Sequence, residues 1–241
     1  MPMTVGVIGY GRFGRLAARI IARHASVLVY DRRGISPRLL SRRIRLATLA
    51  KTASQQIVLL AVPASSLRNA LRSIAPFIRQ GALVLDVCAV KAEPVRWMKR
   101  LLPRHAHILG THPLFGPDTA ARSLRGLGVV FCPVRIPRRL LGFVRRAARR
   151  KGLRVRIMTP DRHDRMIAQT ILVTQYVGRL VDGANLRRWE GVTESYARLL
   201  ALVDVARHDT PLLYSDLLRY NRHAPAVDRA LGKAGKRLHR V

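Results

Sequence analysis

A glycine-rich turn near the start of the chain has the spacing needed to hold a phosphate group. Its first glycine allows a tight turn, its second lets the backbone approach a pyrophosphate, and its third permits close packing of a helix on a strand. The N-terminus of the following helix offers unpaired N–H groups and partial positive charge. These residues are therefore predicted to bind a dinucleotide. They are Gly9, Tyr10, Gly11, Arg12, Phe13 and Gly14, in the order GxGxxG.

An acidic residue makes this motif more specific. Asp31 lies 22 residues after Gly9, at the end of the next expected strand, where its carboxylate can accept hydrogen bonds from ribose hydroxyls. A carboxylate there repels a 2′-phosphate and favours NAD, whereas the adjacent Arg32 and Arg33 could hold that phosphate and leave NADP open. The turn after the third expected strand is placed at the middle of the cofactor, and its residues are Ala61, Val62 and Pro63.

Alternating strand and helix patterns position these residues. Short apolar runs predict strands, and apolar residues at helical spacing predict helices between them. The strands are expected at 5–8, 27–30, 57–62, 82–87, 128–131 and 153–158, and the helices from 13 and at 67–74, 95–102 and 140–148. This order predicts an α/β fold, a Rossmann-type doubly wound parallel sheet with helices on both faces.

The pattern changes after Pro160. Four helical stretches follow without a convincing strand, at 164–181, 192–207, 212–220 and 225–238. We therefore expect a dinucleotide-binding Rossmann domain over residues 1–160 and an all-α substrate and dimerisation domain over residues 161–241. Some 80 residues of helix are too few for a large core of their own. The helices are expected to bury their apolar faces against a second copy, which makes a homodimer.

Composition narrows the class of protein. The chain has 241 residues, of which 49% are hydrophobic, and no apolar run approaches the roughly 20 residues of a membrane helix, so no membrane association is expected. A strand beginning at Val5 is expected to leave no room for a signal peptide. Cys88 and Cys132 cannot form a disulfide framework and favour a reducing compartment, so a cytoplasmic location is expected. The sequence predicts no metal site.

The charge balance is strongly positive. Lys and Arg number 45 against 13 Asp and Glu, which gives a formal charge of +32. Phosphate neutralisation drives nucleic-acid binding, so a nucleic acid is one interpretation. The arginines, however, occur in all segments, and aromatic residues, at 5%, do not alternate with basic clusters as a stacking platform requires. We expect no nucleic-acid partner beyond non-specific binding, and a field that attracts a small anionic substrate.

Several further motifs together resemble one enzyme family. Residues 110–117 read GTHPLFGP, residues 86–91 read DVCAVK, and residues 163–165 read HDR. With TQYVGR at 174–179 and LYSDLLRYN at 213–221, they are similar to the prephenate and arogenate dehydrogenases of tyrosine biosynthesis. The resemblance is closest to the arogenate dehydrogenases of plants and covers nearly the whole chain.

The resemblance implies NAD(P)-dependent oxidative decarboxylation of prephenate or arogenate. In that family a hydride passes from the hydroxyl-bearing ring carbon to nicotinamide, and the ring carboxylate leaves as carbon dioxide. The family's histidine takes the hydroxyl proton, and this role carries over to His112, since an imidazole suits it. The alternative for His112 is a structural role in a loop before Pro113. The resemblance places four residues at the substrate, namely Ala89, Thr174, Gln175 and Tyr176. Lys91 is a further candidate for holding an anionic group of the substrate, and the alternative for it is a solvated lysine.

The chain departs from the family pattern at identifiable positions. Ala89 stands where the family usually has a serine that orients the histidine, and Gln175 stands where its helix usually has a histidine. The arginine that many bacterial prephenate enzymes use for the ring carboxylate aligns with Val205, near Arg207. Two alternatives therefore stay open. One is a catalytically altered member acting on a modified, amino-substituted prephenate, and the other is a non-catalytic basic binding module.

The start of the helical part is predicted to be structural. Pro160 and Asp161 precede a helical pattern, as at a helix N-terminus, where an acidic side chain is favourable. His163 and Asp164 are interpreted mainly as structural residues there. Arg179 is expected to be solvated.

Overall fold

The computed structural model describes residues 3–186 and 189–238, and the chain divides into two compact units, residues 1–160 and 161–241. In the first unit the strands are β1 (Thr4–Ile8), β2 (Ser26–Tyr30), β3 (Ile44–Leu46), β4 (Ile57–Leu60), β5 (Leu83–Asp86), β6 (His107–Pro113), β7 (Gly128–Arg135) and β8 (Arg154–Ile157). The helices are α1 (Arg12–Ala22), α2 (Leu49–Ala53), α3 (Ala64–Ile74), α4 (Ala92–Leu101) and α5 (Arg138–Arg150).

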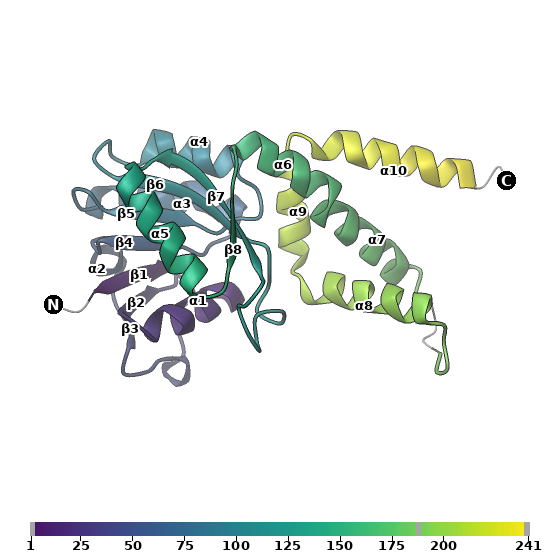
Figure 1. Ribbon diagram of the computed structural model, residues 1–241, viewed down its shortest axis with the longest axis horizontal. Helices are drawn as coiled ribbons and strands as arrows, with labels where there is room; N and C mark the ends of the chain where they lie inside the picture. The colour runs from purple at the N-terminus through teal and green to yellow at the C-terminus, as the bar shows by residue number, and fades with distance from the viewer. Residues whose placement is uncertain (1–2, 187–188, 239–241) are drawn as a thin grey trace. The chain divides into compact units, whose positions relative to one another are not determined.

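The strands of the first unit form one sheet. Over the described residues its order is β3-β2-β1-β4-β5-β6-β7-β8, which confirms the Rossmann-type α/β class (Figure 1). The prediction of an all-parallel sheet is wrong at one place, because β6 and β7 are antiparallel. Residues 114–127, which join them, form turns and no helix, so the chain returns beside β6 without a crossover.

Helices cover both faces of this sheet. α1 and α5 lie on the same face, where their apolar sides pack on residues such as Val7, Leu59 and Leu109 (Figure 1). α2 and α4 lie on the opposite face, since a Cβ added at Gly110 would come within 2.9 Å of Val95 Cγ2 in α4, and one at Gly6 would overlap the backbone of α2. The inner strands are therefore largely buried on both sides, as the apolar runs of β1, β2, β4 and β5 predict, whereas most residues of the edge strands β3 and β8 are exposed.

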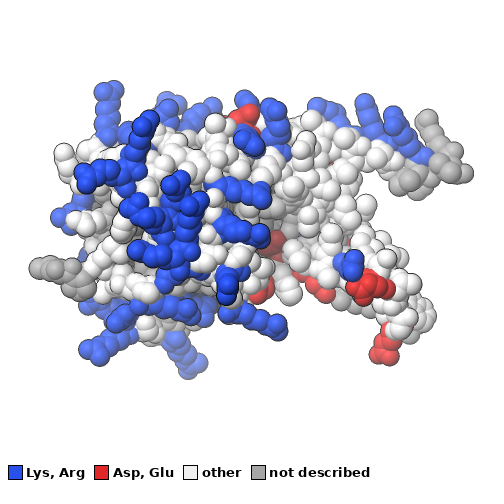
Figure 2. Space-filling model, viewed as in Figure 1, with Lys and Arg blue, Asp and Glu red and all other residues white. Residues whose placement is uncertain are grey.

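The first unit carries most of the net charge. Residues 1–160 contain 31 of the 45 basic residues and only 4 of the 13 acidic ones, so they hold +27 of the total +32. Figure 2 shows lysine and arginine side chains crowded over this unit, where α5 faces the viewer. The basic residues occur in all segments, as the sequence indicates, but the acidic residues that would balance them lie mainly in the second unit.

The described residues of the second unit form helices joined by turns and loops, with no strand. The helices are α6 (Pro160–Gln169), α7 (Ile171–Gly183), α8 (Glu194–His208), α9 (Pro211–Tyr220) and α10 (Ala224–Leu238). The single helix expected over 164–181 is two helices. Thr170 separates them with φ −121° and ψ −83°, outside the helical range, and its hydroxyl donates to Met166 O. A Cβ at Gly178 would lie 2.6 Å from Ala206 Cβ, so α7 and α8 pack closely. No helix in the described ranges is long and apolar enough to cross a membrane.

Candidate active site

The glycine turn lies between β1 and α1, and its three glycines have different surroundings. Gly9 has a φ of +93°, and a Cβ there would overlap Ala61 O. A Cβ at Gly14 would overlap Gly9 O, so this glycine lets α1 approach the turn. A Cβ at Gly11 would meet no atom within 4 Å. The fold thus requires Gly9 and Gly14, whereas Gly11 leaves open space at the N-terminus of α1, where an anionic group is stabilised.

This turn lies where the sheet order reverses. β1 has β2 on one side and β4 on the other, and ligands of such sheets bind outside the carboxyl ends of the strands at this point. The turn after β4, residues Ala61, Val62 and Pro63, is in contact with the glycine turn, because Ala61 N donates to Ile8 O at 2.7 Å. Both loops predicted to meet the cofactor therefore lie side by side.

Asp31 follows β2 beside the same turn. Its Oδ2 accepts from Tyr10 N at 2.7 Å, and its Oδ1 accepts from Arg33 N at 2.9 Å. Each carboxylate oxygen keeps a further lone pair, so the group can still accept hydroxyl donors. Arg32 and Arg33 are exposed next to it.

The side chains within the glycine turn do not all face a ligand. Tyr10 is buried in the core, and its hydroxyl donates to Leu39 O at 2.9 Å, so only its backbone is available to a cofactor. Arg12 donates to both carboxylate oxygens of Asp118 at 2.8 and 2.7 Å, and the ring of Phe13 lies 6.3 Å from that of Phe115. The segment after β6 therefore lies against the glycine turn, a contact that sequence reasoning missed.

His112 lies within β6, and the expectation of a loop position is wrong. It pairs with Val130 of β7, and its side chain is 6% exposed. Alternation along the strand places it on the same face as Gly110, the face that α4 covers. An imidazole near the carboxyl end of a central strand has its backbone fixed by the sheet.

A buried charged cluster lies directly beside His112. Lys91 and Asp86 form an ion pair, and both side chains are 0% exposed. Lys91 Nζ also donates to Thr111 O at 2.6 Å, while Asp86 accepts from Cys88 N at 2.9 Å and from Thr111 N at 3.3 Å. The prediction that Lys91 holds the substrate is corrected accordingly, because its ammonium group is enclosed by protein. The cluster instead connects the end of β5 to Thr111, the residue that precedes His112, through hydrogen bonds.

Ala89 lies in the turn between Asp86 and Lys91 and is half-buried. Its methyl group has no hydrogen-bonding atom, so it cannot orient the imidazole as a serine hydroxyl would.

The second unit contains a separate polar cluster on α7. Gln175 is 1% exposed, and its Nε2 donates to Asp209 Oδ2 at 2.6 Å. Thr174 directs its hydroxyl to Thr170 O of its own helix at 3.1 Å, and Tyr176 is half-buried. Of the substrate-side residues predicted on α7, Gln175 is therefore the one whose side chain lies within a polar network.

Arg179 belongs to this cluster and is not solvated as expected. Its Nη2 lies 3.4 Å from Asp209 O, and its guanidinium lies 5.1 Å from the centre of the Tyr214 ring. Burial raises the pKa of the Tyr214 hydroxyl, and the Arg179 charge partly opposes that shift. Gln175 Oε1 and Arg179 Nε are buried with no hydrogen-bond partner among the described residues. One acceptor and one donor are thus left unsatisfied on adjacent turns of α7.

The start of α6 has ionic contacts of its own. His163 Nδ1 and Asp164 Oδ1 lie 2.8 Å apart with both side chains fully buried. Asp161 accepts from His223 Nε2 at 2.7 Å and from Arg222 Nε at 2.9 Å. The hydrogen bond from His223 is the largest cause that lowers the pKa of Asp161.

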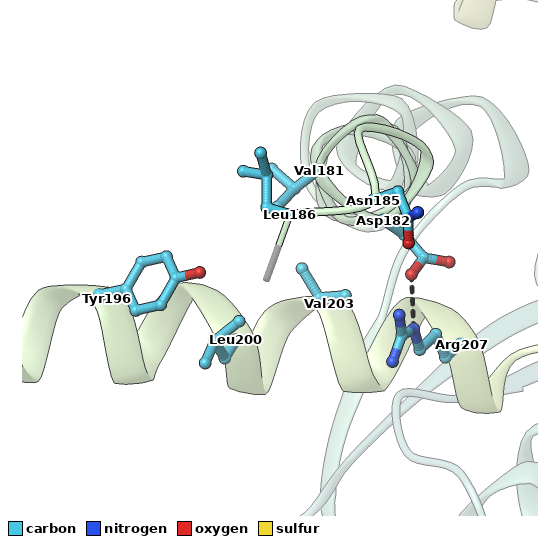
Figure 3. A pocket seen from close by; sticks show the side chains of 8 residues that line it. All are labelled: Val181, Asp182, Asn185, Leu186, Tyr196, Leu200, Val203 and Arg207. Atoms are coloured by element: carbon cyan, nitrogen blue, oxygen red, sulfur yellow. Dashed lines mark hydrogen bonds and ion pairs between the residues drawn. The ribbon is translucent and has the colours of Figure 1, made fainter. Parts of the chain in front are cut away.

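A small open pocket lies between α7 and α8 (Figure 3). Arg207 Nε donates to Asp182 Oδ1 at 2.5 Å across it, so this guanidinium is engaged within the unit. Val205, at the position aligned with the bacterial arginine, is 52% exposed. The lining residues are Val181, Asp182, Asn185, Leu186, Tyr196, Leu200, Val203 and Arg207.

Similarity to known proteins agrees with this arrangement. Residues 42–156 match the family described as prephenate dehydrogenase, nucleotide-binding domain. Arogenate dehydrogenase 2, chloroplastic, of Arabidopsis thaliana is 30% identical over 234 residues, which cover 92% of this chain and 65% of that protein. The chain is thus similar to prephenate and arogenate dehydrogenases. Arogenate dehydrogenase 1, chloroplastic, of the same plant is 28% identical over 234 residues, 92% of this chain and 36% of that protein. The chain thus spans less than two thirds of either relative.

A solved prephenate dehydrogenase structure shares the fold of this chain. The crystal structure of prephenate dehydrogenase from A. aeolicus in complex with hydroxyphenyl propionate and NAD+ superposes with a TM-score of 0.74 at 21% identity. The match covers 100% of this chain and 89% of that one. The Rossmann sheet followed by helices is therefore a fold that this chain shares with that structure.

Proposed function

We propose that the chain is a dehydrogenase that uses NAD, or NADP, to decarboxylate prephenate or arogenate oxidatively. The observation that carries the proposal is the position of His112, fixed in β6 beside a buried Asp86–Lys91 pair in the sheet that carries the glycine turn. The open space at Gly11 and the carboxylate of Asp31 fit the pyrophosphate and ribose of a dinucleotide. The NAD+ in the A. aeolicus relative supports NAD as this dinucleotide.

In the proposed reaction, the hydride is accepted by the bound cofactor and the proton by His112. When bound, the nicotinamide supplies the hydride acceptor. One ring nitrogen of His112 accepts the proton of the ring hydroxyl while hydride leaves the carbon that bears it. Loss of the ring carboxylate as carbon dioxide supplies the electron pair that makes the ring aromatic, and the proton returns from His112 to the phenol oxygen.

The helical unit is proposed to contribute residues that bind the substrate. The unsatisfied Gln175 Oε1 and Arg179 Nε support this role, because buried polar atoms without partners are costly unless a ligand or water satisfies them. Thr174 and Tyr176 are proposed to flank the same substrate. The substrates to be compared in the activity assay are prephenate, arogenate and an amino-substituted prephenate.

A homodimer through the helical unit is also proposed. Large apolar side chains there are more than a third exposed, which supports burial against a second copy. They include Leu180, Leu186, Trp189, Val205, Leu212 and Leu218. A reducing compartment such as the cytoplasm is proposed because Cys88 and Cys132, within the part of the chain described, are buried and not in a disulfide.

The test measures the absorbance of reduced nicotinamide as it forms. Each substrate is assayed with NAD and with NADP separately. His112→Asn is expected to abolish turnover while dinucleotide binding persists, because asparagine cannot act as the base. His107→Asn, at the other end of β6, is the matched control and should stay active. Turnover by His112→Asn at the parent rate would remove His112 from the mechanism, and a parent chain inactive on every substrate would overturn the proposed function.

A further inference from the structure

The outer side of α5 is covered by arginines. We call Arg138, Arg139, Arg145, Arg146, Arg149 and Arg150 the arginine face. At about 100° per residue, these six positions fall within an arc of roughly 140° along the helix, with Gly142 inside the arc. The opposite side of α5, which includes Leu140, Leu141 and Val144, packs on the sheet. The helix therefore presents one continuous basic surface to solvent.

No carboxylate offsets this surface. The sequence contains no Asp or Glu between Asp118 and Asp161. All six arginines are exposed, and among the described residues none of them forms an ion pair. Like charges at this density repel one another and destabilise the helix, so the face is suited to an external polyanion. Figure 2 shows this side of the molecule dominated by basic side chains.

We propose that the arginine face of α5 binds the phosphate backbone of double-stranded DNA without reading its sequence. The arginines span 12 residue steps, roughly 18 Å, which matches about five base pairs at 3.4 Å each. An α-helix fits the major groove of B-form DNA, so arginines spread over this arc can contact phosphates on both sides of it. Guanidinium groups bind phosphate with two parallel hydrogen bonds, which lysine cannot do.

Other polyanions fit this face less well. The major groove of duplex RNA is too narrow for a helix. A single-stranded nucleic acid needs several aromatic side chains on which its bases stack, whereas α5 has one aromatic residue, Phe143. A membrane surface needs an apolar face to insert, whereas the apolar side of α5 is already packed on the sheet. Double-stranded B-form DNA is the polyanion that matches the charge, the length and the arc of the arginine face.

The test measures binding of a fluorescein-labelled DNA duplex of mixed sequence to the full chain by anisotropy, at several salt concentrations. One variant replaces Arg138, Arg145, Arg146 and Arg149 by Gln. The matched control removes the same charge from the α3–α4 side by replacing four other exposed arginines by Gln, namely Arg68, Arg72, Arg79 and Arg100. Duplex RNA, polyglutamate and anionic phospholipid vesicles serve as competitors.

The variant of the arginine face should lose more than about tenfold in affinity at ~0.1 M salt, and its slope of log affinity against log salt should fall by about 3 to 4. The control should change the slope by less than about 1. Unaltered far-ultraviolet circular dichroism would show that both variants fold. Equal losses in both variants would mean that only the overall charge acts and would overturn the proposal. So would a parent chain that binds no DNA, or competition by RNA, polyglutamate or vesicles as strong as that by unlabelled DNA.

Discussion

Replacing Lys91 by methionine should destabilise the first unit strongly. The substitution keeps the length of the side chain but removes the ammonium that pairs with Asp86, and both groups are 0% exposed. Removing one partner of a buried ion pair costs about 3–5 kcal/mol, because the remaining charge is left without compensation. Asp86 would keep its hydrogen bonds from Cys88 N and Thr111 N, which offset only part of that cost.

The measurement is the free energy of unfolding from urea titration, together with the thermal midpoint. At about 2–4 °C per kcal/mol for a chain of this size, the midpoint should fall by roughly 6–20 °C. Lys99→Met replaces an exposed lysine of α4, the helix that Lys91 directly precedes. This matched control should change the free energy of unfolding by less than about 0.5 kcal/mol.

A double variant separates the charge from the packing. In Asp86→Asn with Lys91→Met no buried charge remains, so this protein should be more stable than Lys91→Met alone. Because Lys91 Nζ also holds Thr111 O, both variants should turn over substrate more slowly than the Lys99→Met control. If Lys91→Met unfolds at the same urea concentration as the control, the ion pair does not stabilise the sheet beside His112 and the reasoning fails.

Two other features give direct predictions. The pKa of Asp161 is lowered, so this carboxylate stabilises the fold above its ordinary pKa of 3.8 and loses that contribution as the pH falls through its folded pKa. Asp161→Asn should therefore make stability decline less steeply in this acid range, and a urea midpoint that falls with pH as in the parent would contradict the role of its contact with His223. Gly9→Ala should destabilise the chain by more than about 1 kcal/mol, because φ is +93° and the added methyl overlaps a neighbouring carbonyl. Gly11→Ala should fold normally but bind dinucleotide more weakly in calorimetry, and unchanged affinity would place the pyrophosphate elsewhere.

The sequence predicts those parts of the fold whose signals are local. The glycine spacing predicts the turn after β1, since Gly9 and Gly14 are required there by backbone geometry. β6 was missed because its seven residues, His107–Pro113, mix glycine, histidine and proline and show no apolar run or alternation. Its strand conformation is imposed by pairing with β5 on one side and β7 on the other.

Contacts between site residues that are far apart in the chain could not be predicted from the sequence. A lysine is rarely fully buried, so nothing local indicates that Lys91 is enclosed with Asp86. The unsatisfied atoms of Gln175 and Arg179 depend on how α7 meets the segment around Asp209, which periodicity does not encode. The motif at 110–117 could identify His112 as the histidine of interest, but only the strand pairing shows how it is held.

The antiparallel pairing of β6 with β7 limits how the position of His112 can change during evolution. A histidine in a flexible loop could be reoriented by small changes in that loop, but His112 pairs with Val130 of β7, and β5 pairs with the same strand as far as Gly110. Selection for a new substrate would then act on residues outside β6, while His112 keeps its place in the sheet. Amide hydrogens along β6 should accordingly be among the slowest in the chain to exchange with deuterated solvent.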